Sequence, residues 1–303
     1  MDPLSDILAL LKPKSYGFRG LNAGGAWALA FSADDGIKCY AITSGECWLT
    51  VDGSPQSWRL NAGSFALLSG GQAFRLYSAP EAEPIDAFAF FPSVPAGEIA
   101  VLNGGGDCQG VGGYFDFEGM HAELLLGMLP TVVYISAEEG REDLRWSIER
   151  LMRELRMPQP GSALLGEHLT QALLIEALRL HLTERSRQDI GWLFALADRQ
   201  MHAVISAMHS DLGRKWTLQG LARVAGMSRS TFAARFKETV GESAMDYLTR
   251  WRMMVAADRL ANAGMSIAIV APTVGYESES AFGAAFKHVI GYSPRQYARA
   301  TVG

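Results

Sequence analysis

The chain of 303 residues is long enough for two domains of ordinary size, and its composition of 49% hydrophobic and 19% charged residues excludes a disordered protein. No apolar run reaches the roughly 18–20 residues that a membrane span requires. The net charge of −5 hides an asymmetry: the part from Arg214 onward carries 12 Lys and Arg against 6 Asp and Glu, whereas the preceding part carries 15 against 26. This imbalance suggests that the C-terminal part binds a polyanion.

The N-terminal segment predicts a short amphipathic helix. Leu4, Ile7, Leu8 and Leu11 lie on one helical face, and Pro13 ends the pattern. The segment is acidic before its apolar stretch, whereas a secretory signal is basic there. The three cysteines of the chain form neither a CxxC pair nor an even disulfide set, so we expect a reducing, cytoplasmic location.

Residues 17–135 alternate short apolar segments with turns. The stretches "YAITSGECWLTVDG" and "WRLNAGSFALLSGG" each predict a strand of about six residues, and "PIDAFAFFP" and "TVVYIS" are further strand candidates. Many short strands at this spacing are typical of a β-sandwich or a β-barrel.

This β region contains the candidates for a sensor. A cysteine there either fills the core or acts as a thiol switch that responds to oxidants or electrophiles. Its aromatic residues either line a small apolar effector cavity or belong to the core. The candidate sensor residues are Trp27, Cys39, Cys47, Trp48, Phe74 and Cys108.

Two longer helices are predicted after the β region. "EDLRWSIERLMREL" has the period of one amphipathic helix, and a second helix begins at Ser162. The second helix carries a wide apolar stripe: Leu165, Leu169, Leu173, Leu174, Ala177, Leu178 and Leu180. Two interpretations stay open: the stripe packs within its own domain, or the helix from Ser162 to Leu182 forms a homodimer interface.

The C-terminal part contains one pattern twice. "FKETVGESAMDYLTR" begins at Phe236 and "FKHVIGYSPRQYAR" at Phe286, and the same offset of 50 positions relates Gly241 to Gly291. The stretches that precede these segments also align with each other. We therefore interpret the two copies as a duplicated structural unit.

Each copy has the pattern of a helix-turn-helix. A short apolar-periodic helix is followed by a glycine turn and then by a polar residue that can cap a second helix. The second helix has two large apolar residues one turn apart, and its other face is small and polar, so it fits a DNA major groove. The predicted DNA-binding residues are Arg229, Ser230, Thr231, Ala233 and Lys237 in the first copy and Ser278, Glu279, Ser280, Gly283 and Lys287 in the second.

From about residue 191 to the C-terminus, the sequence resembles the AraC/XylS family of bacterial transcription regulators. The resemblance rests on "LARVAGMSRSTFAARFK", "GESAMDYLTRWRMMVAADRL" and "VGYESESAFGAAFKHVIGYSPRQY". It implies two helix-turn-helix units joined by a long helix from about Ala244 to Ala261. The recognition helices would lie near Ser228–Phe236 and Ser278–Phe286 and enter successive major grooves of promoter DNA, with RNA polymerase as a further partner.

The sequence departs from the family pattern at two positions. The second recognition helix of the family often carries an Arg where this chain has Ala284, and Pro272 lies within the helix before it. We therefore expect the second unit to read bases less directly and to depend more on phosphate contacts and DNA shape.

The N-terminal region resembles the cupin-like sensor domain of one branch of that family, in "GGAWALAF", "CYAITSGECWLTVDG", "RLNAGSFALLSGG" and "LPTVVYI". Metal-binding cupins use two His and a Glu on one strand pair and a further His later. Here the first motif offers Cys39, Tyr40 and Glu46 but no His, and the later position reads Ala73-Phe74. We therefore expect no metal, no cofactor and no enzymatic activity; the alternative is a cupin-type enzyme with an accessory helical domain.

Together these patterns predict a multidomain α+β protein with an N-terminal cupin-like β-barrel, a helical connector and a C-terminal all-α double helix-turn-helix. The expected domains are residues 1–140 as the sensor, 141–190 as the connector with dimerisation helices, and 191–303 as the DNA-binding domain. The predicted protein is a cytoplasmic, homodimeric, sequence-specific regulator of transcription. Its barrel senses a small molecule or a redox or electrophile signal. The operator sequence, and activation against repression, stay open.

Overall fold

The computed structural model describes residues 2–10, 13–34, 36–94, 98–117, 126, 129–136, 142–184, 191–262 and 265–301. The chain divides into two compact units. The sheet unit comprises residues 13–117 and 129–184, and the helical unit comprises residues 1–12, 118–128 and 185–303. The domain boundaries expected after residues 140 and 190 lie in segments outside the described residues.

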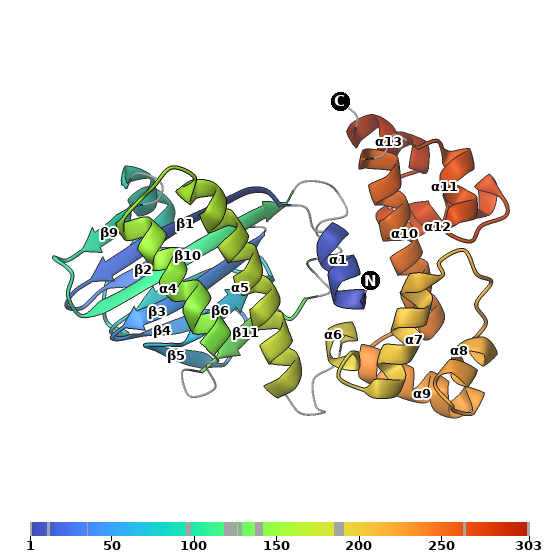
Figure 1. The fold of residues 1–303 in the computed structure, drawn as a ribbon, viewed down its shortest axis with the longest axis horizontal. Helices are drawn as coiled ribbons and strands as arrows, with labels where there is room; N and C mark the ends of the chain where they lie inside the picture. The colour runs from blue at the N-terminus through green and yellow to red at the C-terminus, as the bar shows by residue number, and fades with distance from the viewer. Residues whose placement is uncertain are drawn as a thin grey trace. The chain divides into compact units, whose positions relative to one another are not determined.

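The sheet unit contains two packed sheets (Figure 1). Along one sheet the order is β11-β6-β3-β10-β1-β9, and along the other it is β5-β4-β7-β2-β8. The strands are β1 (Pro13–Ala23), β2 (Ala28–Phe31), β3 (Ile37–Ser44), β4 (Glu46–Val51), β5 (Ser57–Asn61), β6 (Phe65–Leu68), β7 (Phe74–Tyr77), β8 (Pro84–Asp86), β9 (Ile99–Leu102), β10 (Cys108–Phe117) and β11 (Val132–Ile135). Among the described strands neither sheet closes on itself. The cupin-like β fold is therefore confirmed in class, as two open sheets rather than a closed barrel.

The core of the sheet unit lies between its two sheets. Along β4, Cys47, Leu49 and Val51 are buried and alternate with more exposed residues, and the neighbouring β5 buries Trp58 and Leu60 in the same way. This alternation has the two-residue period of a strand with one face turned to the core.

A glycine between β3 and β4 allows a tight reversal of the chain. Gly45 has a φ of 73°, and a Cβ at this position would lie 1.9 Å from the carbonyl oxygen of Asp107. Only glycine fits both the left-handed backbone and the close approach. The stretch that was expected to contain one strand, "YAITSGECWLTVDG", is therefore divided into β3 and β4 at Gly45.

One strand prediction is largely wrong. In "PIDAFAFFP" only Pro84–Asp86 forms a strand, β8, and the chain continues as the short helix α2 (Ala87–Phe90) and a 3-10 helix (Phe91–Ser93). The side chain of Asp86 caps α2 by accepting a hydrogen bond from the backbone N–H of Phe88 at 2.9 Å. This N-cap outweighs the strand preference of the aromatic residues. The strand predicted in "TVVYIS" is confirmed as β11.

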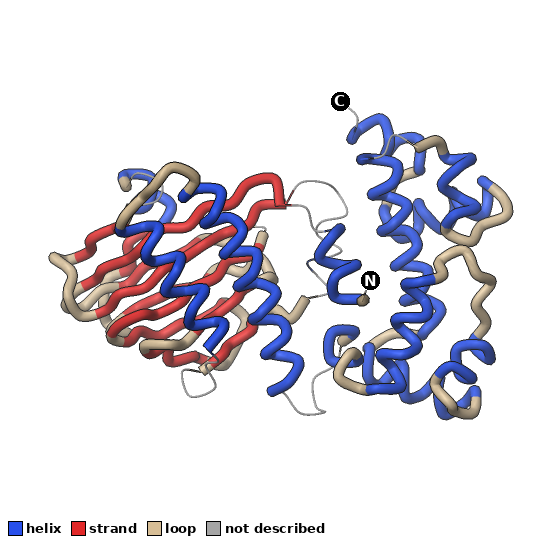
Figure 2. Tube along the Cα trace, in the orientation of Figure 1, coloured by secondary structure: helices blue, strands red, loops and turns tan. Residues whose placement is uncertain are grey.

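Two long helices pack on each other and on the six-stranded sheet (Figure 2). They are α4 (Glu142–Arg156) and α5 (Ser162–Glu184), and they confirm the predicted helical segments. Most of the apolar stripe of α5 is buried within the unit, since Leu173, Ala177 and Leu178 are at most 2% exposed. The width of this stripe therefore gives no argument for a dimer, and the homodimer stays a prediction.

The helical unit follows the internal repeat of the sequence. Its helices are α1 (Pro3–Leu10), α6 (Trp192–Ala195), α7 (Arg199–Ser210), α8 (Leu218–Val224), α9 (Arg229–Val240), α10 (Ala244–Asn262), α11 (Ile267–Thr273), α12 (Glu279–Ile290) and α13 (Pro294–Thr301). The pair α8 and α9 forms the first copy, and the pair α11 and α12 forms the second. The long helix α10 joins the copies, as the family resemblance implied.

The same buried aromatic triad stabilises each copy. It consists of Phe232, Phe236 and Tyr247 in the first copy and of Phe282, Phe286 and Tyr297 in the second, all 0% exposed. Successive ring centroids are 5.6 and 5.9 Å apart in the first triad and 5.5 and 5.5 Å apart in the second. The duplication recognised in the sequence is therefore a duplication of packing.

The N-terminal helix α1 packs within the helical unit, against α7 and α10. Its Ile7 is fully buried, and Asp6 Oδ2 lies 3.3 Å from Nδ1 of His209 on α7. The His209 ring stacks on Trp251 with centroids 4.0 Å apart, and its Nε2 lies 2.8 Å from the hydroxyl of Tyr247. Burial lowers the pKa of His209 to about 3, so this imidazole is neutral at physiological pH.

Candidate nucleic-acid interface and effector cavity

The recognition helices α9 and α12 both begin at a capping serine. The hydroxyl of Ser228 accepts a hydrogen bond from the backbone N–H of Thr231 at 3.2 Å, and the hydroxyl of Ser278 accepts one from Ala281 at 3.2 Å. Each cap satisfies one N–H that the first helical turn would otherwise leave unpaired. The caps therefore fix where each recognition helix starts and which residues follow at its N-terminal end.

The predicted DNA-binding residues lie on the surface of the two recognition helices. They are exposed, except for Ala233 and Gly283, which are half-buried. Thr231 also supports the cap, because its hydroxyl lies 2.8 Å from the hydroxyl of Ser228. The hydroxyl of Ser230 lies 3.2 Å from the same Ser228 hydroxyl, so Arg229 is the first-turn side chain of α9 with most freedom to contact a ligand.

The first recognition helix is also tied to α7. The guanidinium of Arg235 donates to the side-chain oxygen of Gln200 at 2.9 Å and forms an ion pair with Asp198. Asp198 in turn caps α7. Arg235 therefore positions α9. The helical period of the sequence alone could not show whether this arginine contacts DNA or another helix.

The two exposed faces differ in charge and size. The first turn of α9 carries Arg229, whereas that of α12 carries Glu279. Further along, α12 has Gly283, at which an added Cβ would meet no atom within 4 Å. The face of α9 is therefore better supplied with hydrogen-bond donors than that of α12.

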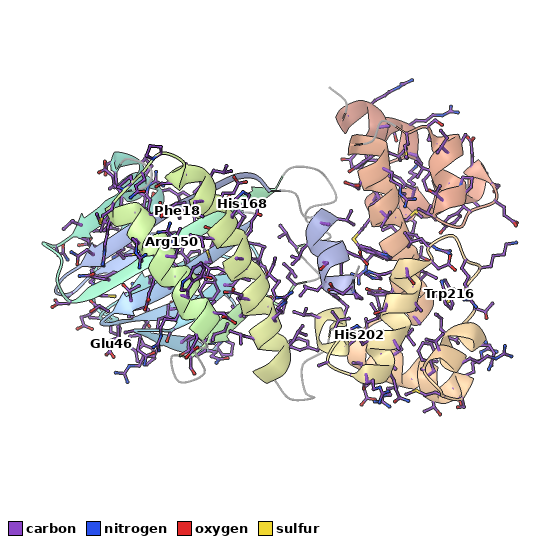
Figure 3. The ribbon with its side chains drawn as sticks, viewed as in Figure 1. Phe18, Glu46, Arg150, His168, His202 and Trp216 are labelled. Carbon is purple, nitrogen blue, oxygen red and sulfur yellow. The ribbon has the colours of Figure 1, made fainter. Side chains whose placement is uncertain are left out.

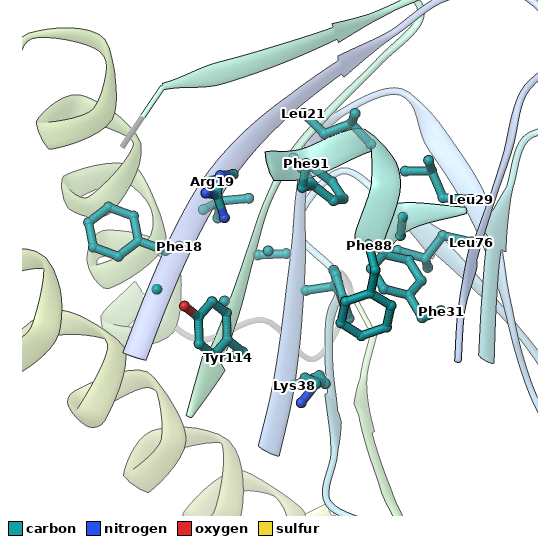
Figure 4. Close-up of a pocket in the computed structure, with 18 of the residues that line it drawn as sticks. Phe18, Arg19, Leu21, Leu29, Phe31, Lys38, Leu76, Phe88, Phe91 and Tyr114 are labelled. Carbon is teal, nitrogen blue, oxygen red and sulfur yellow. The ribbon is translucent and has the colours of Figure 1, made fainter. Parts of the chain in front are cut away.

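A cavity of about 430 Å³ opens in the sheet unit (Figure 4). Its apolar wall includes Trp27 and Phe31, and Phe88 and Phe91 of the segment after β8 also line it. Most of the remaining lining residues are aliphatic, aromatic or glycine. The size and apolar lining are those of a site for a small organic molecule.

Three charged side chains line the same cavity. Nζ of Lys38 forms an ion pair with Asp34 Oδ2 at 2.8 Å. Arg19 donates from Nε to the carbonyl oxygen of Val94 at 3.4 Å, and no carboxylate within the described part of the chain pairs with its guanidinium. The charged part of the lining is therefore left with one unbalanced positive charge.

A thiol pair adjoins the cavity. Cys47 lines it, and the neighbouring thiol of Cys108 interacts with that of Cys47. This contact raises the pKa of Cys47 and lowers that of Cys108. The cavity wall therefore includes one member of a pair of neighbouring thiols.

Comparison with known proteins decides the family. Residues 2–183 match the cupin family, and residues 221–300 match the family of helix-turn-helix domains. An AraC-like transcription regulator of Streptomyces lividans is 41% identical over 298 residues, which cover 98% of this chain and 98% of that protein. The chain belongs to the AraC family of transcription regulators.

Two further proteins are similar to this AraC-family regulator at lower sequence identity. The HTH-type transcriptional regulator AlkR of Acinetobacter baylyi is 29% identical over 305 residues, which cover 98% of this chain and 99% of that protein. The crystal structure of ToxT from Vibrio cholerae aligns with a TM-score of 0.38 and 14% identity, covering 95% of this chain and 98% of that chain. The relatives found by sequence are named as regulators, so the chain is a regulator, and the alternative of a cupin-type enzyme is not favoured. Within the described residues, no helix is long and apolar enough to cross a membrane.

The sensor candidates of this AraC-family regulator lie in different surroundings. Trp27 and Cys47 line the cavity, and Phe74 stacks on the cavity residue Phe31 with centroids 4.3 Å apart. Cys108 contacts Cys47, as described above. These candidates stay predictions, but the structure places them in or beside one cavity.

The two remaining sensor candidates lie elsewhere. Trp48 is 36% exposed. Cys39 lies close to Gly113 on the side of the sheet that Thr170 of α5 covers, and burial raises the pKa of Cys39 to about 12. Sequence reasoning missed Arg19 and Lys38 as cavity residues, because an isolated cation on a strand gives no sign of which face it occupies.

Proposed function

We propose that this regulator reads two unequal DNA half-sites, one with α9 and one with α12, and that a small molecule in the cavity of the sheet unit sets its activity. The observation that carries the first part is the repeated, capped helix with an exposed polar N-terminal face. Such a helix fits a major groove, and two of them on one long helix suit half-sites about one turn apart, roughly 34 Å.

The residues of the two faces suggest different base preferences. Arg229 can donate two hydrogen bonds to guanine, whereas Glu279 can accept from cytosine but is repelled by phosphate. Lys237 and Lys287 are exposed, and in this proposal they neutralise phosphates. The first half-site would therefore carry more of the sequence preference, and the second would contribute more through the DNA backbone.

Selection from a random duplex library by the full-length protein tests the DNA-reading proposal. We expect two enriched blocks with centres about 10 base pairs apart, and an affinity whose log–log slope against salt is near −5 for about six neutralised phosphates. Recovery of unenriched sequence, or of a single block, would contradict it.

The cavity favours an apolar molecule with an acidic group as the effector. Its aromatic wall suits a ring system. The guanidinium of Arg19 suits a carboxylate, which can accept two parallel hydrogen bonds from it. The pair of Lys38 and Asp34 is already neutral as a unit, so Arg19 is the charge that an acidic ligand would balance.

Two matched probes test this ligand class. We expect 2-naphthoate to raise the melting temperature of the full-length protein, and uncharged naphthalene-2-methanol to raise it less. Arg19→Gln should remove the difference between the probes, whereas Arg59→Gln, at an exposed pair with Glu46, should keep it (Figure 3). Equal shifts with both probes in the unsubstituted protein would count against an acidic ligand, and no shift with either would remove ring-containing acids altogether.

A thiol signal is the second candidate, favoured by the contact of Cys47 with Cys108. A peroxide would oxidise the two thiols to one disulfide and be reduced to two molecules of water. We expect intact-mass analysis of the peroxide-treated protein to show the loss of two hydrogens, and Cys47→Ser to abolish it. Loss of DNA binding without that change in mass would exclude this pair as the sensor.

We also infer a homodimer that acts in the cytoplasm and contacts RNA polymerase at its promoter. A dimer contact on α5 would use its outward side, where Leu164 is 57% exposed and Ile175 is half-buried. Leu164→Asp should then give a folded monomer in sedimentation experiments. An unsubstituted protein that is monomeric at tens of micromolar would contradict the dimer.

A further inference from the structure

The glycine turns of the two helix-turn-helix copies occupy matching positions but have different surroundings. Gly226 and Gly275 both adopt left-handed backbone, with φ of 65° and 85°. A Cβ at Gly226 would meet nothing within 4 Å. A Cβ at Gly275 would lie 2.6 Å from a guanidinium nitrogen of Arg252 and 2.9 Å from the carbonyl oxygen of Leu212. The second turn is therefore pressed against another part of the molecule, and the first is not.

The contact at Gly275 joins the second copy to the segment that leads into the first. Leu212 belongs to the segment between α7 and α8, which leads into the first copy. Gly275 lies between α11 and α12, three residues before the capping serine of α12. A backbone carbonyl cannot move aside as the end of a flexible side chain can, so the approach of Leu212 requires glycine at position 275.

Arg252 of α10 holds this junction together. Its guanidinium donates to the carbonyl oxygen of Arg214 at 2.6 Å and lies 6.0 Å from the ring centroid of Tyr276. One side chain of the connecting helix thus contacts both the segment that precedes the first copy and the turn of the second. On the rim, exposed Lys215 pairs with Glu277 across the same junction.

The segment that Arg252 contacts is itself held in place. The indole N–H of Trp216 donates to the carbonyl oxygen of Asp211 at 2.9 Å, and the guanidinium of Arg214 lies 4.1 Å from the Trp216 ring centroid (Figure 3). The carbonyl group that accepts the hydrogen bond from Arg252 therefore belongs to a fixed turn. Its contact with Arg252 can hold this turn in one position relative to α10.

A purely stabilising role explains Arg252 poorly. Its Nε is buried and has no hydrogen-bond partner among the described residues. Burial of a partly unpaired guanidinium is costly, and an aliphatic residue would avoid that cost. The planar guanidinium instead fixes the geometry of the junction, because it donates to a backbone carbonyl while it packs beside Gly275.

We propose that the contact of Arg252 with Arg214, Leu212 and Gly275 fixes the separation and angle of α9 and α12, and so determines the half-site spacing that the regulator accepts. This inference rests on the two-reader function proposed above, in which α9 and α12 each read one half-site. It attributes the accepted half-site spacing to named residues. Insertion of one base pair moves a half-site by about 3.4 Å and rotates it by about 35°. A rigid pair of readers cannot follow such a change, whereas a pair joined by α10 alone can bend to follow it.

The test uses duplexes that the full-length, unsubstituted protein selects from a random library. Affinity is measured for the selected spacing, for spacings changed by one base pair, and for duplexes with one half-site scrambled. We expect the unsubstituted protein to lose about tenfold or more on a one-base-pair change. Arg252→Met keeps an unbranched side chain but removes the guanidinium donor. It should bind the selected spacing more weakly, lose less than about threefold on the change and keep its affinity for duplexes with a single intact half-site.

Gly275→Ala and Gly226→Ala form a matched pair. Both place a Cβ on left-handed backbone and share the strain of that conformation, but only the Cβ at 275 also meets Arg252 and the carbonyl oxygen of Leu212. We expect relaxed spacing for Gly275→Ala and unchanged spacing preference for Gly226→Ala. If Arg252→Met does not fold, as judged by circular dichroism, Arg252→Lys replaces it, because it keeps the charge and removes the planar guanidinium.

Three outcomes can be told apart. Relaxed spacing in the Arg252 and Gly275 variants with intact half-site affinity supports the proposal. Unchanged spacing discrimination in folded variants overturns it while the two-reader function stands. Failure of the unsubstituted protein to select paired half-sites removes the two-reader function itself.

Discussion

The two helix-turn-helix copies share their interior and differ on their surface. Each buries the same triad of two phenylalanines and a tyrosine, with closely similar ring distances. Outside the triad, α9 begins with Arg229 and is tied to α7 through Arg235, whereas α12 begins with Glu279 and has a glycine on its face. The comparison teaches that packing constrains the buried residues of a duplicated unit strongly. The exposed residues are less constrained, so each copy can recognise a different DNA sequence.

The largest expected effect tests the shared interior. Phe236→Ala and Phe286→Ala each remove a fully buried ring, so each should lower the free energy of unfolding by about 3–5 kcal/mol. Urea unfolding of the full-length protein measures both values. A difference of more than about 2 kcal/mol between them would indicate that the two interiors are not energetically equivalent.

The second prediction concerns the contact of Tyr247, in the first triad, with His209. The pKa of His209 is lowered to about 3 in the folded state, against about 6.5 when unfolded, so the folded state binds fewer protons between these values. Its stabilising contribution is present above pH 6.5 and is lost as the pH falls, by about 1.4 kcal/mol per pH unit, or about 2 kcal/mol at pH 5. Urea midpoints between pH 7 and pH 5 measure this loss.

His209→Gln keeps hydrogen-bonding groups but does not titrate, so its stability should vary less over that range. His202→Gln, at an exposed residue of the same helix, is the matched control and should leave the slope unchanged. Burial raises the pKa of the neighbouring Asp6, which acts in the opposite direction at lower pH. If the stability of His209→Gln varies with pH as steeply as that of the unsubstituted protein, another group is responsible for the pH dependence.

The third prediction sharpens the difference between the exposed faces. Arg229→Ala should weaken binding to a selected duplex by about 1–3 kcal/mol for each lost base contact. Glu279→Ala should weaken it little or strengthen it, because the carboxylate is repelled by phosphate. Titration at fixed salt compares the two. An equal loss in both variants would show that the faces contribute alike.

The smallest effect compares two matched lysines at offset 50, Lys237 and Lys287, which are both exposed. If each neutralises one phosphate, replacement of either by Ala should reduce the slope of log affinity against log salt by about 1 and leave sequence preference unchanged. A variant that changes the preferred sequence would assign its lysine to base contact instead.

The sequence predicted the helical unit well because its helices are determined by residues that are close together in the chain. Ser228 and Ser278 identified the helix starts, and the repeated phenylalanines identified the buried face of each recognition helix. The contact of Arg252 with Gly275 could not be predicted. It joins residues that are distant in the sequence, and the glycine looks equivalent to Gly226 until its neighbours are known.

The sheet unit was predicted in class but not in detail. Alternation gave strands and cupin-like motifs gave the family, yet the cap of α2 by Asp86 overrode a strand prediction. The cavity depends on side chains that several strands bring together, so Arg19 and Phe31 could not be recognised as neighbours from spacing alone.

The most direct test of unequal readers compares base-preference profiles for the unsubstituted protein, Arg229→Ala and Glu279→Ala, each selected from the same random duplex library. The two-reader account predicts that Arg229→Ala relaxes base preference in one half-site only, and that Glu279→Ala alters preference in the other. If both substitutions change the same base pairs, or neither changes any, α9 and α12 do not read separate half-sites.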